Sequence, residues 1–340
     1  MSQTQPTVRP EPSGAAFSYP DRPAEAEPSP ADRRHLLGLE GMTRAGLTEI
    51  LDAAGHWRER LRRGRLACDE LAGVAVVNAF FEDSTRTRVS FELAQHRLGA
   101  IPVSFSPAGS SVSKGESLLD TLHTIVAMGV DLVVVRHPSP GTPALLARHL
   151  EAGVVNAGDG AHEHPTQGLL DLLTLRDAWH GRFEGRRLAI VGDIAHSRVA
   201  RSAIFGLHTL GASVRLAGPA TLVPRGIESL GCEVAESLEQ ALQGADAVMA
   251  LRLQRERMEA GLLPSLGEYA REWGLDAARL RLLEPGAVVM HPGPMNRGVE
   301  IAPEVADGER SVVLAQVANG VAVRCAVLAR CAAAVAEARA

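Results

Sequence analysis

The chain has 340 residues, 46% of them hydrophobic, and a formal net charge of −5 at pH 7. This is enough apolar sequence for two domain cores, yet no apolar run approaches the length of a membrane span and no signal-peptide pattern opens the chain. The negative charge argues against a general nucleic-acid surface, and four scattered cysteines without a CxxC pair predict reduced thiols of a cytoplasmic protein.

The first predicted element is an extension. Residues 1–34 are rich in Pro, Ala and Glu, a composition that predicts disorder. Thr43 can then cap a helix whose apolar residues recur at helical spacing. Short apolar runs separated by helical stretches follow, which is typical of parallel sheets with helices on both faces. The predicted strands are residues 73–81, 131–135, 152–158, 186–193, 212–218, 245–252 and 286–293.

The run that begins at residue 186 starts a second sheet, so we expect a domain break near residues 165–185. The sequence therefore predicts an α/β fold with two doubly wound parallel-sheet domains. We place the first domain at residues 35–170 and the second at residues 171–311. The last helix, within residues 312–340, is expected to pack back on the first domain.

The segment after the first strand, "FFEDSTRTRVSFE", predicts an anion site. Ser84, Thr85, Arg86 and Thr87 open a helix there, and a helix N-terminus with hydroxyls and an arginine attracts phosphate or carboxylate. An ordinary N-cap beside surface arginines is the alternative. The hydroxyls continue past the cap position, which favours the anion site.

Later predicted strands also end in polar residues, at the edge where open α/β sheets bind ligands. These residues are Arg136, His137, His164, Gln167, Arg198, Arg252 and Gln254, and the turn at Gly293 and Pro294 exposes backbone carbonyls. The excess of cations suits a pair of small anionic ligands. The "HEH" of residues 162–164 also admits a metal site, but it lies at a helix start and not at the end of a first strand with ligands to follow, so we expect no metal. The "VGDIAHSR" turn lacks GxGxxG, so dinucleotide binding is weakly supported.

Lys114, in "SVSKGES", is the only lysine, and the other 34 basic residues are arginines. A coding bias that spared one lysine by chance is one explanation. The other is that this position needs a compact ammonium with three rotatable donors, where a planar guanidinium would not fit.

Six motifs in one order resemble the catalytic subunits of aspartate carbamoyltransferases over about residues 35–335. They are "FFEDSTRTRVSFE", "SVSKGES", "VRHP", "GDGAHEHPTQGLLD", "LRLQRER" and "HPGPMNRGVE". The resemblance implies a carbamoyl-phosphate domain, an aspartate domain, a trimer with shared active sites, and no cofactor or metal.

The resemblance also implies roles for single residues. The phosphate of carbamoyl phosphate would be held by Ser84, Thr85, Arg86 and Thr87. The carbonyl oxygen would be surrounded by Thr87, Arg136 and His164, and the amino group would be fixed by Gln167 and the carbonyls around Gly293 and Pro294.

The carboxylates of aspartate would be bound mainly by Arg198, Arg252 and Gln254, with Glu82 and Asp193 orienting these groups. Ser110 and Lys114 would complete the neighbouring subunit's site. Lys114 would lie between the phosphate and the aspartate carboxylate, where a slim point charge fits and a guanidinium would crowd the substrates. That position accounts for the single lysine.

Two rivals share this fold. Ornithine carbamoyltransferases carry a cationic second substrate that Arg252 would repel, and they have "HCLP" where this chain has "HPGP" and an "SMG" motif that we do not find. A non-catalytic scaffold would have lost a charged site residue, and none is lost.

Three further stretches resemble the bacterial branch that assembles with dihydroorotase or an inactive relative of it, namely "GDIAHSRVARS", "LRLQRERM" and "LLPSLGEY". In that branch the N-terminal extension is implicated in assembly.

Overall fold

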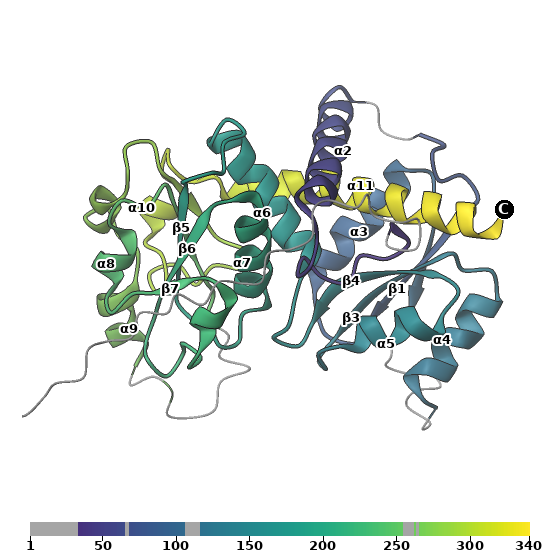
Figure 1. The fold of residues 1–340 in the computed structure, drawn as a ribbon, viewed down its shortest axis with the longest axis horizontal. Coiled ribbons are helices and arrows are strands. Elements are labelled where there is room, and N and C mark those ends of the chain that lie inside the picture. Colours follow the sequence, from purple (N-terminus) through teal and green to yellow (C-terminus); the bar gives the residue numbers. More distant parts are fainter. Residues whose placement is uncertain (1–32, 65–67, 106–115, 254–261, 263–264) are drawn as a thin grey trace, which may run out of the picture.

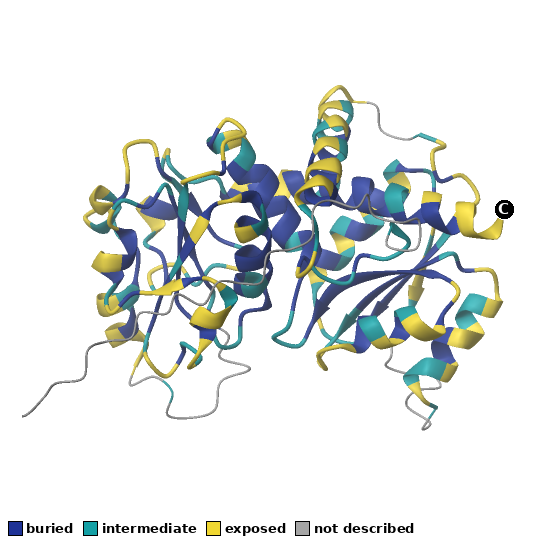
Figure 2. Cartoon of the chain, viewed as in Figure 1, coloured by how far each residue is buried: buried dark blue, intermediate teal, exposed yellow. Residues whose placement is uncertain are grey.

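The structure, a computed structural model, describes residues 33–64, 68–105, 116–253, 262 and 265–340. Two lobes, each built around one parallel sheet, lie side by side with helices α6 and α7 at their junction (Figure 1). Buried residues form a core in each lobe and continue through the junction (Figure 2). The predicted fold of two parallel-sheet α/β domains is confirmed. The extension at residues 1–32 lies outside the described residues.

The first sheet has the strand order β2-β1-β3-β4, and all neighbours are parallel. Its strands are β1 (Ala75–Phe80), β2 (Ile101–Phe105), β3 (Leu132–His137) and β4 (Gly153–Asp159). Phe80 pairs with Arg136, and His137 pairs with Asp159. The segments that follow β1, β3 and β4 therefore leave the same edge of the sheet as neighbours, which brings their polar residues together.

The second sheet has the order β7-β6-β5-β8-β9 and is also parallel. Its strands are β5 (Arg187–Val191), β6 (Ser213–Ala217), β7 (Glu233–Val234), β8 (Ala247–Ala250) and β9 (Val288–Met290). Val191 pairs with Ala250, and Met249 pairs with Met290. The carboxyl ends of β5, β8 and β9 lead toward Arg198, Arg252 and Gly293.

Helices cover both sheets (Figure 1). They are α2 (Arg44–Arg62), α3 (Thr85–Arg97), α4 (Leu118–Ala127), α5 (Thr142–His149), α6 (Pro165–Ala178), α7 (Arg198–Leu210), α8 (Leu238–Leu242), α9 (Leu266–Trp273), α10 (Pro303–Ala306) and α11 (Val313–Arg339), with 3₁₀ turns at Ile227–Leu230 and Arg279–Leu282. The predicted cap of α2 is confirmed, since the Thr43 hydroxyl accepts from the Gly46 N–H at 3.1 Å. None of the helices within the described residues combines the length and apolar character needed to cross a bilayer.

The last helix, α11, joins the two lobes. It begins beside β9, passes α6 and ends at the far side of the first lobe, where it packs on α2 and α3 (Figure 1). Three polar side chains are buried along it, namely Gln316, Asn319 and Arg324. The helix therefore fixes the loop after β9 relative to the first sheet. The domain bounds at residues 170 and 311 stay a prediction.

Candidate active site

The N-terminus of α3 presents hydroxyls that the helix does not use. Ser84 occupies the N-cap position, yet its side chain makes no capping hydrogen bond within the described chain. Thr87 is buried one turn further on, and Thr85 and Arg86 are exposed. Unused hydroxyls and free N–H groups at a helix start are the arrangement that binds phosphate.

Arg86 reaches across to the second lobe. A Cβ built on Gly293 would lie 2.9 Å from Arg86 Nη1, so the guanidinium rests directly against the backbone that follows β9. Gly293 has a φ of +66°, and the Gly293–Pro294 peptide is cis. Although the residue as a whole is exposed, partial desolvation of its guanidinium lowers the pKa of Arg86, and the neighbouring charge of Arg252 lowers it further. Two cations held this close favour an anion between them.

Glu82 joins two predicted site arginines from different lobes. Its carboxylate accepts from Arg198 Nη2 at 2.7 and 2.9 Å and from Arg136 Nη2 at 3.3 Å. The side chains of Arg136 and Arg198 are only 11% and 6% exposed, so both charges need a buried acceptor. Arg136 also donates to the Ala157 carbonyl at 3.2 Å. The contacts agree with the orienting role predicted for Glu82, which stays a prediction.

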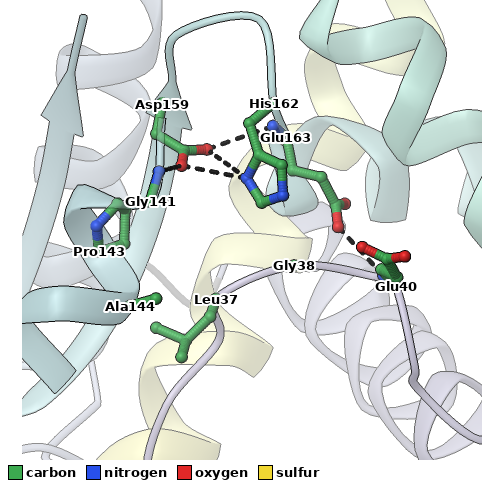
Figure 3. A pocket seen from close by; sticks show the side chains of 9 residues that line it. All are labelled: Leu37, Gly38, Glu40, Gly141, Pro143, Ala144, Asp159, His162 and Glu163. Carbon is green, nitrogen blue, oxygen red and sulfur yellow. Dashed lines mark hydrogen bonds and ion pairs between the residues drawn. The ribbon is translucent and has the colours of Figure 1, made fainter. Parts of the chain in front are cut away.

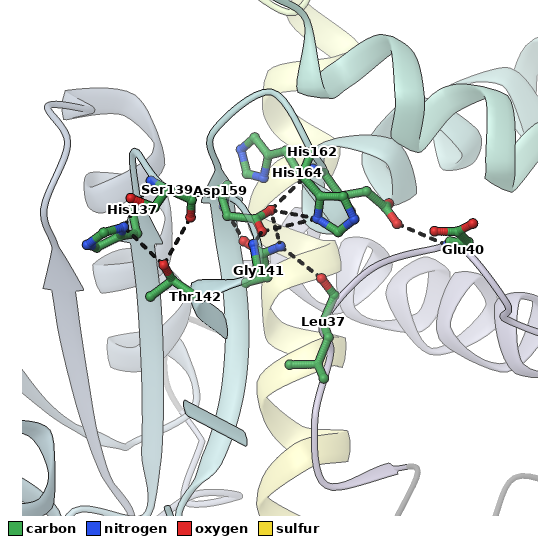
Figure 4. A network of polar contacts seen from close by, with 12 residues as sticks. Leu37, Glu40, His137, Ser139, Gly141, Thr142, Asp159, His162 and His164 are labelled. Atoms are coloured by element: carbon green, nitrogen blue, oxygen red, sulfur yellow. Dashed lines mark hydrogen bonds and ion pairs between the residues drawn. The ribbon is translucent and has the colours of Figure 1, made fainter. Parts of the chain in front are cut away.

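The turn between β4 and α6 is held by Asp159. Its carboxylate accepts from the Gly141 N–H at 2.7 Å, from Asn156 Nδ2 at 2.9 Å and from the Glu163 N–H at 3.2 Å, and His162 Nδ1 lies 3.1 Å away (Figure 4). These bonds fix the turn that ends at His164, the N-cap residue of α6. Asp159 was not among the predicted site residues, although it ends a strand directly before them.

His164 is buried and uncharged. Its backbone N–H donates to Ser202 Oγ at 2.9 Å, and its Nδ1 is buried with no hydrogen-bond partner in the described residues. Burial holds the pKa of His164 well below its ordinary value, and the charges of Arg136, Arg324 and Arg198 lower it further. A neutral imidazole keeps one N–H that can donate to an oxygen without adding another buried charge.

Three predicted residues, Ser110, Lys114 and Gln254, lie outside the described residues. Of the others, Asp193 is buried and accepts from the His196 N–H at 3.2 Å, with His196 Nδ1 at 2.8 Å from the same oxygen. The structure thus places Asp193 against the turn before α7. Its predicted role toward the arginines stays a prediction.

A cavity of about 180 Å³ lies beside the β4–α6 turn, and its lining includes Leu37, Asp159 and His162 (Figure 3). Ligand atoms of Glu40, His162 and Glu163 lie within 4.8 Å of one another beside it. The Glu163 carboxylate accepts from the Leu39 and Glu40 N–H groups and from Ser202 Oγ, at 2.8 to 3.1 Å. These three donors account for the buried carboxylate, and through them Glu163 ties the chain before α2 to α7.

Comparisons with known proteins agree with this geometry. Residues 34–177 match the model of the aspartate/ornithine carbamoyltransferase carbamoyl-P binding domain, and residues 184–331 match that of the Asp/Orn binding domain. The chain therefore belongs to the aspartate/ornithine carbamoyltransferase family.

The aspartate carbamoyltransferase catalytic subunit of Pelotomaculum thermopropionicum is 57% identical over 87% of this chain and 95% of its own. The catalytic subunit of Myxococcus xanthus is 56% identical over 88% of this chain and 99% of its own. The fold is shared with Trypanosoma cruzi aspartate transcarbamoylase in complex with carbamoyl phosphate, at a TM-score of 0.79, 30% identity and coverage of 87% and 96%. Ornithine carbamoyltransferase of Thermus thermophilus has a TM-score of 0.76 and 27% identity, and the match covers 88% of this chain and 98% of that one. By these relatives, the chain is an enzyme with aspartate carbamoyltransferase activity.

Proposed function

We propose that the site between the two lobes transfers the carbamoyl group of carbamoyl phosphate to the α-amine of L-aspartate, giving N-carbamoyl-L-aspartate and phosphate. This is an early step of pyrimidine biosynthesis in the family. The observation that carries the proposal is the contact of Glu82 with both Arg136 and Arg198, because it joins the two halves of the site.

The first lobe binds carbamoyl phosphate in this scheme. The hydroxyls of Ser84, Thr85 and Thr87 and the guanidinium of Arg86 hold the phosphate at the start of α3. Gln167 and the carbonyls at Gly293 and Pro294 accept from the carbamoyl amino group. The position of Arg86 against Gly293 supports this, since the group proposed for the phosphate and the carbonyl proposed for the amino group are neighbours, as the two ends of one small molecule require.

The chemistry follows from the charges. The neutral amine of aspartate attacks the carbonyl carbon, a tetrahedral intermediate forms, and the C–O bond to phosphate breaks. Arg136, His164 and Thr87 donate to the oxyanion, and donors fixed in advance stabilise it at no cost in reorganisation. The amine proton passes to an oxygen of the departing phosphate. Bringing the two substrates together in one orientation supplies much of the remaining rate.

The second lobe selects aspartate. Arg198 and Arg252 bind its two carboxylates with Gln254, and Arg136 and Lys114 complete the set. Ornithine is disfavoured because its side-chain ammonium would face the Arg252 guanidinium, which lies close enough to Arg86 to lower the pKa of that residue.

We also propose a quaternary structure. We infer a homotrimer in which Ser110 and Lys114 of one subunit complete the site of the next. A larger complex with dihydroorotase or its inactive relative, in which residues 1–34 take part, rests on the sequence resemblance. The four cysteines are free thiols, which favours the cytoplasm. A protein that lacks residues 1–34 and yet forms a complex of unchanged size would remove the role of the extension.

Turnover of the purified protein with carbamoyl phosphate tests the function. Aspartate and ornithine are supplied in parallel, and the products are separated. We expect carbamoylaspartate alone. Citrulline alone would overturn the assignment of the Arg252 pocket. If neither forms, the assay is repeated with dihydroorotase, and continued inactivity contradicts the proposal.

A further inference from the structure

Asp171 is a buried carboxylate in the middle of α6, at the junction of the two lobes. One of its oxygens, Oδ1, accepts from two side-chain amides, Gln316 Nε2 at 2.7 Å and Gln167 Nε2 at 3.1 Å. The other oxygen, Oδ2, has no hydrogen-bond partner in the described part of the chain.

Asp171 begins two chains of hydrogen bonds, called here the first and second arms. The first arm is the bond to Gln167, one turn earlier on α6. An amide can present either its oxygen or its NH₂ group to a ligand, since the two ends have nearly the same shape. Because Gln167 donates its Nε2 to Asp171, its Oε1 is left to accept from a ligand. That is the orientation a carbamoyl amino group requires.

The second arm runs through α11 to the loop after β9. Gln316 donates to Asp171, and its Oε1 accepts from the His291 N–H at 3.0 Å. His291 Nδ1 in turn accepts from the Gly293 N–H at 2.8 Å. His291 Nε2 faces Glu300 Oε1 at 3.3 Å, so the ring proton resides on Nε2. The loop that carries the Gly293 and Pro294 carbonyls is therefore fixed from the same carboxylate oxygen.

We propose that Asp171 is a positioning residue that aims both sets of acceptors, Gln167 Oε1 and the carbonyls at Gly293 and Pro294, at the amino group of carbamoyl phosphate. It thereby selects a carbamoyl group over an acyl group that has a methyl in place of the NH₂. This inference rests on the proposed function, because it deepens the account of the same site.

The chemistry of Asp171 favours this role. Burial raises its pKa to about 7, while the bonds from Gln316 and Gln167 act in the opposite direction. A carboxyl of this kind offers Oδ1 as an acceptor in either protonation state, so both amides keep their orientation. A buried group with one unsatisfied oxygen costs stability, and such groups persist where a function requires them.

A mere link between helices would not need Asp171. One turn further along α6, Asn319 Nδ2 on α11 already donates to Thr174 Oγ1 at 2.9 Å. That contact joins the same two helices with neutral side chains and does not reach the site. It provides a matched control.

The test compares the affinities of carbamoyl phosphate and acetyl phosphate for the full-length protein. Acetyl phosphate keeps the phosphate and the carbonyl and replaces NH₂ by CH₃. In the wild type we expect carbamoyl phosphate to bind roughly tenfold to a hundredfold more tightly, since acceptors left facing a methyl lose their hydrogen bonds. In Asp171→Leu this ratio should fall to within about threefold. Asp171→Asn, which keeps one acceptor oxygen, should restore most of it.

Thr174→Val is the control, and we expect it to lower the melting temperature without changing the ratio. If Asp171→Leu does not fold, Gln316→Leu breaks the second arm alone and should lower the ratio less, with kcat for carbamoyl phosphate falling as well. The inference is overturned if Asp171→Leu still prefers carbamoyl phosphate as the wild type does, or if its affinities for carbamoyl phosphate and acetyl phosphate fall by the same factor. Either result leaves the proposed function standing. A wild type that does not bind carbamoyl phosphate defeats the proposed function itself.

Discussion

The carboxylate of Glu82 accepts from Arg198 Nη2 with both oxygens, at 2.7 and 2.9 Å, and so joins the segment after β1 to the first turn of α7. These two residues come from different lobes and are 116 positions apart. Because Glu82 also accepts from Arg136, one carboxylate orients an arginine proposed for each substrate.

Glu82→Gln tests this relationship. The amide keeps the shape but replaces the charge, and it weakens charge-assisted bonds worth about 1.5–3 kcal/mol each. We expect kcat/KM for aspartate to fall by roughly tenfold to a hundredfold. Steady-state kinetics measures this. Glu233→Gln is the control, since Glu233 pairs with Arg215 at 3.0 Å on the exposed edge of the second sheet. Equal losses in both variants would contradict the account.

Gly293→Ala tests the contact with Arg86. The new Cβ would meet Nη1 at 2.9 Å, so the guanidinium must shift, and the φ of +66° adds strain. We expect KM for carbamoyl phosphate to rise about tenfold. Gly298→Ala is the matched control for backbone strain, because the φ of Gly298 is +78° and nothing lies within 4 Å of the added carbon. Both should lose about 1–2 kcal/mol of stability, and only Gly293→Ala should lose affinity.

The depressed pKa of His164 predicts acid lability. The folded state binds fewer protons than the unfolded state once the pH drops below the unfolded pKa of 6.5. The free energy of unfolding then falls with decreasing pH, by up to about 1.4 kcal/mol per unit for this one group. His164→Gln should flatten the decline between pH 6.5 and 5 in urea titrations. His123→Gln, on an exposed face of α4, should leave it unchanged. Identical slopes in all three proteins would refute the assignment.

The proposed sharing of sites between subunits predicts complementation between inactive variants. Lys114→Ala and Arg198→Ala should each reduce turnover strongly when purified alone. After the two are mixed, dissociated and reassembled, each mixed trimer contains roughly one site with both residues intact. Activity should therefore reappear on mixing. A mixture that stays inactive, although trimers form, would show that Lys114 does not serve the neighbouring subunit.

The sequence predicted the buried strands well, including the edge strand β4, and missed β2 and β7. β1, β3, β4, β5 and β8 are buried on both faces, so each is a continuous apolar run. β2 was missed because it is largely exposed and contains Pro102, and β7 was missed because it has only two residues. Both lie at the edge of a sheet, and neither is buried enough to show a continuous apolar run.

The site residues show the same division. Residues at strand ends, such as Arg136 and His164, could be predicted because the ends of parallel strands meet. Asp171 could not, since a lone acid within an apolar helix gives no sign of two amide partners, one of them 145 residues away. Asp159 was missed for a related reason, because its role is to hold the backbone of a turn.

We propose that one site spans both lobes, with the phosphate at α3 and the aspartate carboxylates at α7. Calorimetric titration with N-(phosphonacetyl)-L-aspartate, which carries both ends in one molecule, tests it most directly. We predict that Arg86→Ala and Arg198→Ala each weaken binding by at least about tenfold, while Arg215→Ala does not. Unchanged affinity in Arg198→Ala would mean that the second lobe does not take the aspartate end.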